Sequence, residues 1–429
     1  MCLTHVLSPV ILTNRDPQHD TLQLISEPRS HPEPVDASDT RYEEIPMPNP
    51  EHTSLPDTMR AVIVHGPQDY RLEERPVPEP GPGELLLRTD AVGVCASDLK
   101  CYHGAEKFWG GDHKPPWAET NRIPGHEFVG TVVAAGTGAL SERKVEIGDR
   151  LACEQIVPCW ECFYCNRGNY WMCEPHDMFG FKGFDGAMAE YVLVPARALT
   201  HQVATQLPGQ YAAFSEPLSC AMHSVERANV QFEDTVVVAG AGPIGLSAIA
   251  GARQKNPLRI IALDMVDQKL DLAKACGADI AINIAEEDAV AKVKEMTGGY
   301  GADVYIEATG HPSAVGQGLN LLRKLGRFVE YSVFKEKAAV DWSIISDDKE
   351  LDVLGAHLGP HCWPAAIKLL EDGKLPMEEI CTHQFPLDQF QQALDMVDDS
   401  SGKSVKVSIL PNGPIPTGTA NNLLGADPE

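Results

Sequence analysis

The sequence predicts an α/β protein in which an irregular β-rich region precedes a parallel, doubly wound sheet. One observation is a change of pattern near residue 217, after which continuous apolar strand-like runs alternate with helical runs. That alternation is typical of a parallel sheet covered by helices on both faces. The other observation is the region before it, where short strand-like runs are separated by prolines and glycines, as expected of all-β structure.

The β-rich region is expected to begin near residue 59. Its strand-like runs are RAVIVHG, a second stretch through ELLLRTDAVGV, FVGTVVAAG and AEYVLVP. The alternating region is expected to hold strands at 235–240, 259–264, 279–284, 302–309 and 326–332, and helices at 243–254, 268–276, 288–296 and 313–323. After about His357 a helical run and a final strand-like SVKVSIL are expected to return to the first region. The sequence therefore predicts one domain formed by residues 59–216 and 358–410 and a second formed by residues 217–357.

Length and charge limit the possible functions. With 429 residues the chain has room for two or three domains, and its net charge of −26 argues against nucleic acid and anionic membrane surfaces. No apolar run approaches the roughly 18 residues of a membrane span. Residues 1–58 carry ten carboxylates, three arginines and nine prolines, so they are expected to be a disordered acidic extension, like the tail at 411–429. Neither a signal peptide nor a transit peptide fits, which indicates the cytoplasm.

Four cysteines within fifteen residues predict a structural metal site. They follow a C-x2-C-x2-C-x7-C spacing in CWECFYCNRGNYWMC and are Cys159, Cys162, Cys165 and Cys173. Four thiolates brought together suit a closed, tetrahedral Zn²⁺ site. Two local disulfides are the alternative, which the scattered remaining cysteines and a reducing compartment disfavour.

The first βα turn of the alternating region predicts a dinucleotide site. The run VVVAGAGPIG places Gly240, Gly242 and Gly245 in a G-x-G-x-x-G pattern, and Pro243 and Ile244 open the helix whose N–H groups would face a pyrophosphate. This is the arrangement of a Rossmann domain. Asp264 ends the next strand, where a carboxylate accepts ribose hydroxyls and repels a 2′-phosphate, so NAD is expected rather than NADP. A glycine turn without a cofactor, or one holding a flavin, are the alternatives.

Further potential metal donors lie elsewhere in the chain. Cys95 lies in GVCASDLK, His126 and Glu127 in IPGHEFVG, and Glu216 in AFSEPLSCAMH, where the two predicted domains meet. Each alone is more often structural than a ligand. Their presence together with a four-cysteine lobe and a dinucleotide turn favours a second, catalytic metal site.

These motifs, in this order, resemble the zinc-dependent medium-chain dehydrogenase/reductase superfamily. The resemblance rests on GVCASD, GHE, the four-cysteine lobe, EPLSCAMH and GAGPIG, and it covers residues 59–410. It implies a GroES-like catalytic domain and a Rossmann domain with an active site between them. It also implies that Cys95 and His126 bind a catalytic zinc, with Glu127 and Glu216 as acidic ligands, directly or through water.

Glu216 indicates the polyol branch of the family. The corresponding position is a cysteine in liver-type alcohol dehydrogenases and a glutamate in sorbitol-type enzymes. In the implied mechanism, zinc lowers the pKa of the substrate hydroxyl, Ser97 passes its proton towards the nicotinamide ribose, and hydride moves to NAD. The resemblance also implies a homodimer or homotetramer that meets near Leu351–His357.

The segment after Ser97 departs from the sorbitol enzymes. It carries Lys100, Cys101 in place of the usual tyrosine, His103, and the aromatic residues Phe108, Trp109 and Trp117, which either line the substrate cleft or pack. Together with EQIVPCWEC, EATGHPSAV and VDWSII it is most similar to the erythritol/L-threitol dehydrogenase group. That similarity implies oxidation of a four-carbon polyol to a ketose such as erythrulose.

Three other readings remain open at this point. An L-threonine-type dehydrogenase shares the same motifs, and a primary-alcohol dehydrogenase is disfavoured by Glu216. A catalytically silent NAD-binding partner would be expected to lack one or more donors, whereas this chain keeps all four. The same donors exclude the zinc-free quinone reductases.

Overall fold

The structure, a computed structural model, describes residues 55–399 and 402–414 and contains two large β-sheets. All of these residues fall within one compact unit. The predicted acidic extension lies outside the described residues except for 55–58, and the predicted tail except for 411–414. Within the described part of the chain, none of the helices combines the length and the apolarity that a membrane span requires.

The first large sheet is mainly antiparallel and joins strands from the early and late parts of the described chain. Its strand order is β10-β5-β4-β3-β18-β17, and β9 also pairs with β3. The bounds are β3 Leu85–Val94, β4 Glu127–Ala135, β5 Arg150–Cys153, β9 Tyr191–Val194, β10 Thr200–Gln202, β17 His383–Pro386 and β18 Val407–Leu410. Because β18 pairs antiparallel with β3, the C-terminal part of the chain completes the sheet begun by the N-terminal part.

Smaller elements surround this sheet. A hairpin is formed by β1 (Thr58–Gly66) and β2 (Asp69–Pro76), and a second small sheet by β6 (Ile156–Val157), β7 (Asp177–Phe179) and β8 (Gly183–Phe184). The helices here are α1 Ala96–Tyr102, α2 Glu106–Trp109, α3 Ala139–Arg143, α4 Gly209–Ala212, α10 Trp363–Glu371, α11 Met377–Ile380 and α12 Phe390–Asp398. Short 3-10 turns are η1 Cys165–Arg167, η2 Tyr170–Met172 and η4 Leu387–Gln389.

The second large sheet is parallel and doubly wound, as the sequence predicts. Its order is β13-β12-β11-β14-β15-β16. The strands are β11 Thr235–Ala239, β12 Arg259–Asp264, β13 Ile280–Asn283, β14 Ala302–Glu307, β15 Leu322–Glu330 and β16 Asp352–Gly355. The helices are α5 Ser215–Arg227, α6 Pro243–Gln254, α7 Asp267–Ala275, α8 Ala289–Met296 and α9 Pro312–Leu321, with the π-turn η3 Ile344–Asp348.

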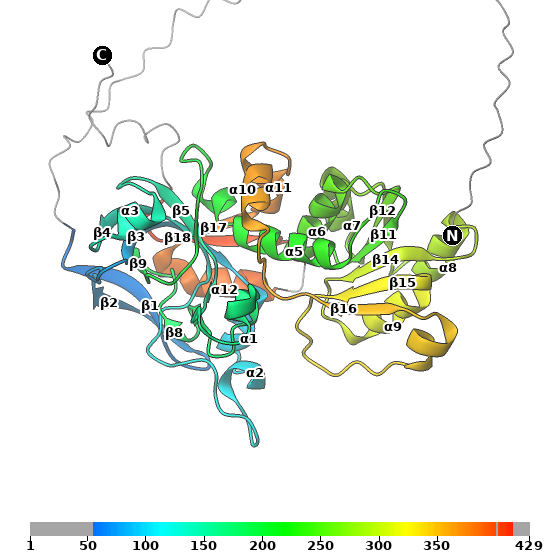
Figure 1. Cartoon of the computed structure of the whole chain (residues 1–429), viewed down its shortest axis with the longest axis horizontal. Coiled ribbons are helices and arrows are strands. Elements are labelled where there is room, and N and C mark those ends of the chain that lie inside the picture. Colours follow the sequence, from blue (N-terminus) through cyan, green and yellow to red (C-terminus); the bar gives the residue numbers. More distant parts are fainter. Residues whose placement is uncertain (1–54, 400–401, 415–429) are drawn as a thin grey trace, which may run out of the picture. The chain divides into compact units, whose positions relative to one another are not determined.

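Alternating side chains of the parallel strands pack on opposite faces of this sheet. Val236 and Val238 join one core with α5, α6 and α7, whereas Val237 and Ala239 join another with α8 and α9 (Figure 1). Both faces are therefore covered by helices, which explains why these strands are apolar throughout. The predicted α/β fold class is confirmed.

The boundary between α9 and β15 differs from the prediction. The helix expected at 313–323 ends at Leu321, and β15 begins at once with Leu322. The apolar run GLNLLRKLG contains no proline or capping residue at that point, so the sequence carries no stop signal there. At the other end, Asn412 donates hydrogen bonds to the carbonyl oxygens of Thr89 and Glu190, so ordered structure continues into the first residues of the predicted tail.

The connection from β16 to α10 is an unusually constrained segment. Leu358 and His361 both adopt left-handed backbone conformations, with φ of 55° and 62°. Between them, Gly359 approaches α5 so closely that a Cβ there would lie 2.3 Å from the Ser219 Oγ. The His361 ring also packs edge-on against Tyr170 of the four-cysteine lobe. This connection therefore touches both the lobe and the helix that carries Glu216.

Candidate active site and zinc centres

The first candidate metal donor is held by the start of α1. Cys95 follows the last residue of β3 and is the N-cap of the helix. The Asp98 carboxylate accepts a hydrogen bond from the Cys95 backbone nitrogen at 2.9 Å, which forms a capping box. This local arrangement fixes where the thiol points.

Asp98 also holds the second donor. Its other carboxylate oxygen lies 3.3 Å from His126 Nδ1, and both side chains are almost fully buried. The opposite ring nitrogen, Nε2, lies 3.5 Å from the hydroxyl of Ser97. A carboxylate on one imidazole nitrogen orients the other nitrogen towards a metal. Sequence reasoning did not assign a role to Asp98, although its position three residues after Cys95 is a capping-box spacing that could have indicated it.

The third donor begins β4, and its side chain is paired with a lysine from the far end of the chain. Glu127 is opposite Gly93 of β3, where a Cβ would lie 2.3 Å from its carboxylate, so only glycine fits. Its carboxylate forms a buried ion pair with Lys406, whose Nζ also donates to the Val94 carbonyl at 3.1 Å. No spacing in the sequence links residues 127 and 406.

The donor atoms of Cys95, His126 and Glu127 lie within 4.8 Å of one another. Glu216, in the first turn of α5, lies next to this group but outside that limit. Its carboxylate accepts hydrogen bonds from the Gln155 amide and from the Cys220 thiol at 3.2 Å. The structure thus brings three predicted donors together and places the fourth beside them.

The charge of this group fits a divalent cation. Burial, and then the nearby Glu127 carboxylate, raise the pKa of Glu216 to about 7. Burial disfavours a charge on His126, but Asp98 outweighs it and raises the histidine pKa. Both Glu216 and His126 bind a proton more tightly than usual, because the group carries more negative donors than its surroundings neutralise. The set of thiolate, imidazole and carboxylates is one that binds Zn²⁺.

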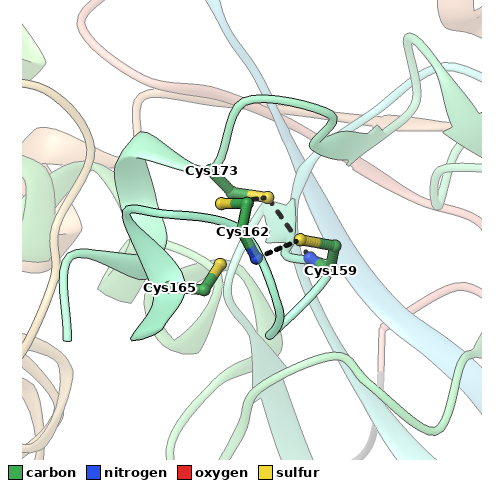
Figure 2. A group of neighbouring side chains, drawn as sticks. All are labelled: Cys159, Cys162, Cys165 and Cys173. Atoms are coloured by element: carbon green, nitrogen blue, oxygen red, sulfur yellow. Dashed lines mark hydrogen bonds between the residues drawn. The ribbon is translucent and has the colours of Figure 1, made fainter. Parts of the chain in front are cut away.

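The four-cysteine lobe forms a separate potential metal site (Figure 2). The sulfur atoms of Cys159, Cys162, Cys165 and Cys173 lie within 4.8 Å of one another, and all four are free thiols. The Cys159 backbone nitrogen donates to the Cys173 sulfur at 3.3 Å, and the Cys162 nitrogen to the Cys159 sulfur at 3.3 Å.

The thiol pKa values in this lobe also fit a metal. Backbone N–H groups, first that of Cys165, lower the pKa of Cys162 to about 6. Burial raises the pKa of Cys165 and Cys173. The backbone around the lobe therefore favours the thiolate form of Cys162, whereas burial disfavours it for Cys165 and Cys173. The alternative of two local disulfides is not what the structure shows.

The glycine-rich turn has the geometry that a dinucleotide needs. Gly240 has φ of 93°, and a Cβ on Gly245 would lie 1.8 Å from the Gly240 carbonyl oxygen. Gly242 has open space where its Cβ would be, at the N-cap of α6. Pro243 and Ile244 begin that helix, as predicted. The turn thus leaves free N–H groups next to an open approach for phosphates.

Asp264 lies beside this turn at the end of β12. One carboxylate oxygen accepts from the Ala241 nitrogen at 2.7 Å, and the other from the nitrogens of Met265 and Val266. A carboxylate has about four acceptor positions. One position therefore remains for a ribose hydroxyl.

The aromatic residues after Ser97 form one cluster, in which Phe108 and Trp117 both lie against Phe181, with ring centroids 5.2 and 5.7 Å from it. Phe108 is 5% exposed, and the Trp109 indole donates to the Cys101 carbonyl at 2.7 Å, so both pack. Trp117 stacks at a tilt on Phe181, whose ring lies 5.1 Å from that of His126. This part of the cluster reaches the candidate metal group.

Sequence models of two known domains match the chain. The one described as an alcohol dehydrogenase GroES-like domain matches residues 81–205, and the one described as a zinc-binding dehydrogenase matches 243–372. An erythritol/L-threitol dehydrogenase of Mycolicibacterium smegmatis is 66% identical over 359 residues, which are 83% of this chain and 99% of that protein. The chain belongs to the zinc-dependent medium-chain dehydrogenase/reductase superfamily of oxidoreductases, which confirms the family predicted from the motifs.

One more distant relative is named for a different substrate. An L-threonine 3-dehydrogenase of Pyrococcus abyssi is 35% identical over 78% of this chain and 93% of that protein. Among solved structures, an E. coli CFT073 alcohol dehydrogenase complexed with NADH has a TM-score of 0.73 at 28% identity, covering 83% of this chain and 100% of that one. A zinc-binding dehydrogenase of Sinorhizobium meliloti bound to NADP has a TM-score of 0.75 at 28% identity, covering 82% and 99%.

Proposed function

We propose that this protein is a zinc- and NAD-dependent polyol dehydrogenase that oxidises a secondary hydroxyl of erythritol or threitol to a ketose such as erythrulose. The observation that carries the proposal is the 66% identity, over nearly its whole length, to an erythritol/L-threitol dehydrogenase. The complete donor group of Cys95, His126 and Glu127, with Glu216 beside it, supports a working enzyme rather than a silent partner.

In the proposed site, Cys95 and His126 hold the catalytic zinc, and Glu127 and Glu216 supply carboxylates directly or through water. Bound zinc supplies Lewis acidity, which lowers the pKa of the substrate hydroxyl. Ser97, which lies 3.5 Å from His126 Nε2, accepts the hydroxyl proton and passes it towards the cofactor ribose. A bound NAD would supply the hydride acceptor, and the buried surroundings of the donor group would exclude water from the transfer.

We propose NAD rather than NADP because Asp264 occupies the ribose end of the turn. A carboxylate next to the 2′ position repels a phosphate there. The four cysteines of the lobe are proposed to hold a second, structural zinc, which gives two zinc ions per subunit. Metal analysis of the wild type and of Cys162→Ser tests this count, since the variant should lose one zinc and part of its folding stability.

The division at residues 216/217 and 357/358 into catalytic and nucleotide-binding domains remains our proposal. We further propose a homodimer or homotetramer that uses β16, the edge strand of the parallel sheet, where Val353 is 46% exposed. Edge strands present unpaired backbone groups to a second copy. The free thiols of the described cysteines support a cytoplasmic location.

The second candidate is an L-threonine dehydrogenase, which the 35% identity to such an enzyme favours. The deciding experiment measures NAD reduction with erythritol, both threitols, xylitol, sorbitol, L-threonine and ethanol. A kcat/KM preference for four-carbon polyols supports the proposal, and activity on L-threonine alone overturns it. Cys95→Ser should abolish turnover but leave NAD binding nearly unchanged, whereas retained activity would contradict the catalytic zinc assignment.

A further inference from the structure

Glu216 is held by two neighbours that act on the same one of its carboxylate oxygens. The side-chain amide of Gln155 and the thiol of Cys220 both donate to Oε1, the thiol at 3.2 Å. The amide also donates to the Cys220 sulfur at 3.3 Å. The three side chains are only 2%, 3% and 5% exposed, so water does not compete for these bonds. The carboxylate is therefore fastened through Oε1, and Oε2 takes part in none of the three bonds.

The backbone fixes each member of this triangle. Glu216 and Cys220 are four residues apart on α5, so their side chains lie on one face of the helix. Gln155 lies between β5 and β6, and its backbone carbonyl accepts a hydrogen bond from the Phe179 nitrogen of β7 at 3.0 Å. Helix and strand connection together set the distance between the amide and the carboxylate.

Only one orientation of the Gln155 amide suits this position. Turning the amide over would place its oxygen against Glu216 Oε1, so that two acceptors would meet. In the orientation present, the amide oxygen is buried and has no hydrogen-bond partner in the described part of the chain. A buried acceptor without a partner costs free energy, which a leucine of similar size would avoid. The two bonds that the amide donates therefore account for a glutamine here.

The restrained carboxylate stands apart from the other metal donors. The donor atoms of Cys95, His126 and Glu127 lie within 4.8 Å of one another, whereas the Glu216 carboxylate falls outside that limit. Three protein ligands with one open position suit a catalytic zinc, because the substrate takes the fourth position. A further carboxylate bound directly would close the site.

We propose that Gln155 is a positioning residue that holds Glu216 beside the catalytic zinc and out of its direct ligand set, so that one position stays open to the substrate. This inference rests on the proposed zinc-dependent activity. The amide acts only through Oε1 of Glu216 and touches neither metal nor substrate. Without this restraint, a buried carboxylate next to a divalent cation is stabilised most by binding the cation directly.

The test compares the zinc-loaded wild type with Gln155→Leu. Loss of an outer hydrogen-bond partner usually weakens a metal site, but here the released carboxylate should become an additional ligand. We expect the catalytic zinc to leave about tenfold more slowly in excess chelator, and kcat for erythritol to fall about tenfold or more. The KM for NAD should not change.

A spectrum provides a readout that is independent of turnover. With Co²⁺ in place of zinc, the visible absorption of Gln155→Leu should differ from that of the wild type, because the metal gains a ligand. The four-cysteine lobe is the same in both proteins, so the difference between the two spectra reports the catalytic group.

Two further variants separate this restraint from packing. Ser219→Ala removes a buried hydroxyl on the same helix that donates to the Glu216 backbone carbonyl at 2.8 Å rather than to its carboxylate. This variant should lower the melting temperature without slowing zinc release. Adding Glu216→Gln to Gln155→Leu removes the carboxylate itself, and the slow release should then disappear.

The opposite results would overturn the inference. Zinc release from Gln155→Leu that is faster than in the wild type, or unchanged, would mean that the amide only supports the site or its packing. If Gln155→Leu does not fold, Cys220→Ala removes the other donor to Oε1 and should slow zinc release by a smaller factor; an unchanged or faster release would again overturn the inference. A wild type that binds zinc only in the four-cysteine lobe would overturn the proposed function, and this inference with it.

Discussion

The buried ion pair between Glu127 and Lys406 gives the sharpest test of how the catalytic group is held together. The two residues are 2% and 3% exposed, so the pair is shielded from water. Lys406→Met leaves the Glu127 carboxylate buried without its cation, which costs about 3–5 kcal/mol. The lost hydrogen bond to the Val94 carbonyl adds about 1 kcal/mol.

A double-mutant cycle isolates the pair. Glu127→Gln alone leaves the lysine buried and unpaired, but Glu127→Gln combined with Lys406→Met removes both charges. The double variant should therefore lose about 2–3 kcal/mol less unfolding free energy than the two single variants lose when their losses are added. Thermal unfolding midpoints of the zinc-loaded proteins measure the differences.

The exposed pair Arg60–Glu190 provides a matched control. Its nitrogen and oxygen are 2.9 Å apart, but the arginine side chain is 48% exposed, so Arg60→Met should cost no more than about 1 kcal/mol. Single losses that simply add at the buried pair would show that something other than Lys406 neutralises Glu127. If Lys406→Met loses less unfolding free energy with zinc bound than without zinc, Glu127 also donates to the metal.

Three further predictions follow from the structure. Asp264→Ala should raise the KM for NAD and bring the kcat/KM for NADP closer to the kcat/KM for NAD. A wild type that already uses both cofactors equally would contradict the assignment of Asp264. Burial, and then Arg227, lower the pKa of His223 from 6.5 to about 4. Between these two pKa values the unfolded chain binds more protons than the folded protein, so the unfolding free energy should fall by roughly 3 kcal/mol as the pH drops from about 6.5 to 4. His223→Gln should flatten this pH dependence of the melting temperature. An unchanged slope in the variant would refute the role of His223. Gly359→Ala should displace α5 and lower both zinc content and the melting temperature, because its Cβ would lie 2.3 Å from the Ser219 Oγ. Gly316→Ala on α9, with open space around the Cβ, should change neither zinc content nor activity.

Spacing alone predicts only those parts of the candidate site whose residues are close together in the chain, whereas Cys95, His126, Glu127 and Glu216 were expected from the family resemblance. The four cysteines and the G-x-G-x-x-G turn each occupy one short segment, so spacing alone indicates the chemistry. The pairing of Glu127 with Lys406 joins residues 279 positions apart and leaves no pattern in the sequence. Likewise, no pattern in the sequence links Gln155, between β5 and β6, to the Glu216 carboxylate 61 positions away, which accepts a hydrogen bond from its amide.

A boundary is easier to predict where a residue marks the start or end of an element. Helix α6 begins at Pro243 and ends at Gln254 as predicted, because a proline at its first position marks the start. The helix before β15 was predicted two residues too long, since Leu321 and Leu322 suit a helix and a buried strand equally well.

The place of Lys406 in the chain also has a consequence for the order in which the protein is made. During synthesis at roughly 5–20 residues per second, Lys406 emerges about 15–55 s after Glu127, which it neutralises across 279 residues of chain. Until then the nascent catalytic sheet lacks β18 and carries a carboxylate that it cannot bury at low cost. Lys406 therefore joins the candidate metal group long after its other members are synthesised, and a chain that stops before residue 406 lacks the counter-charge of Glu127.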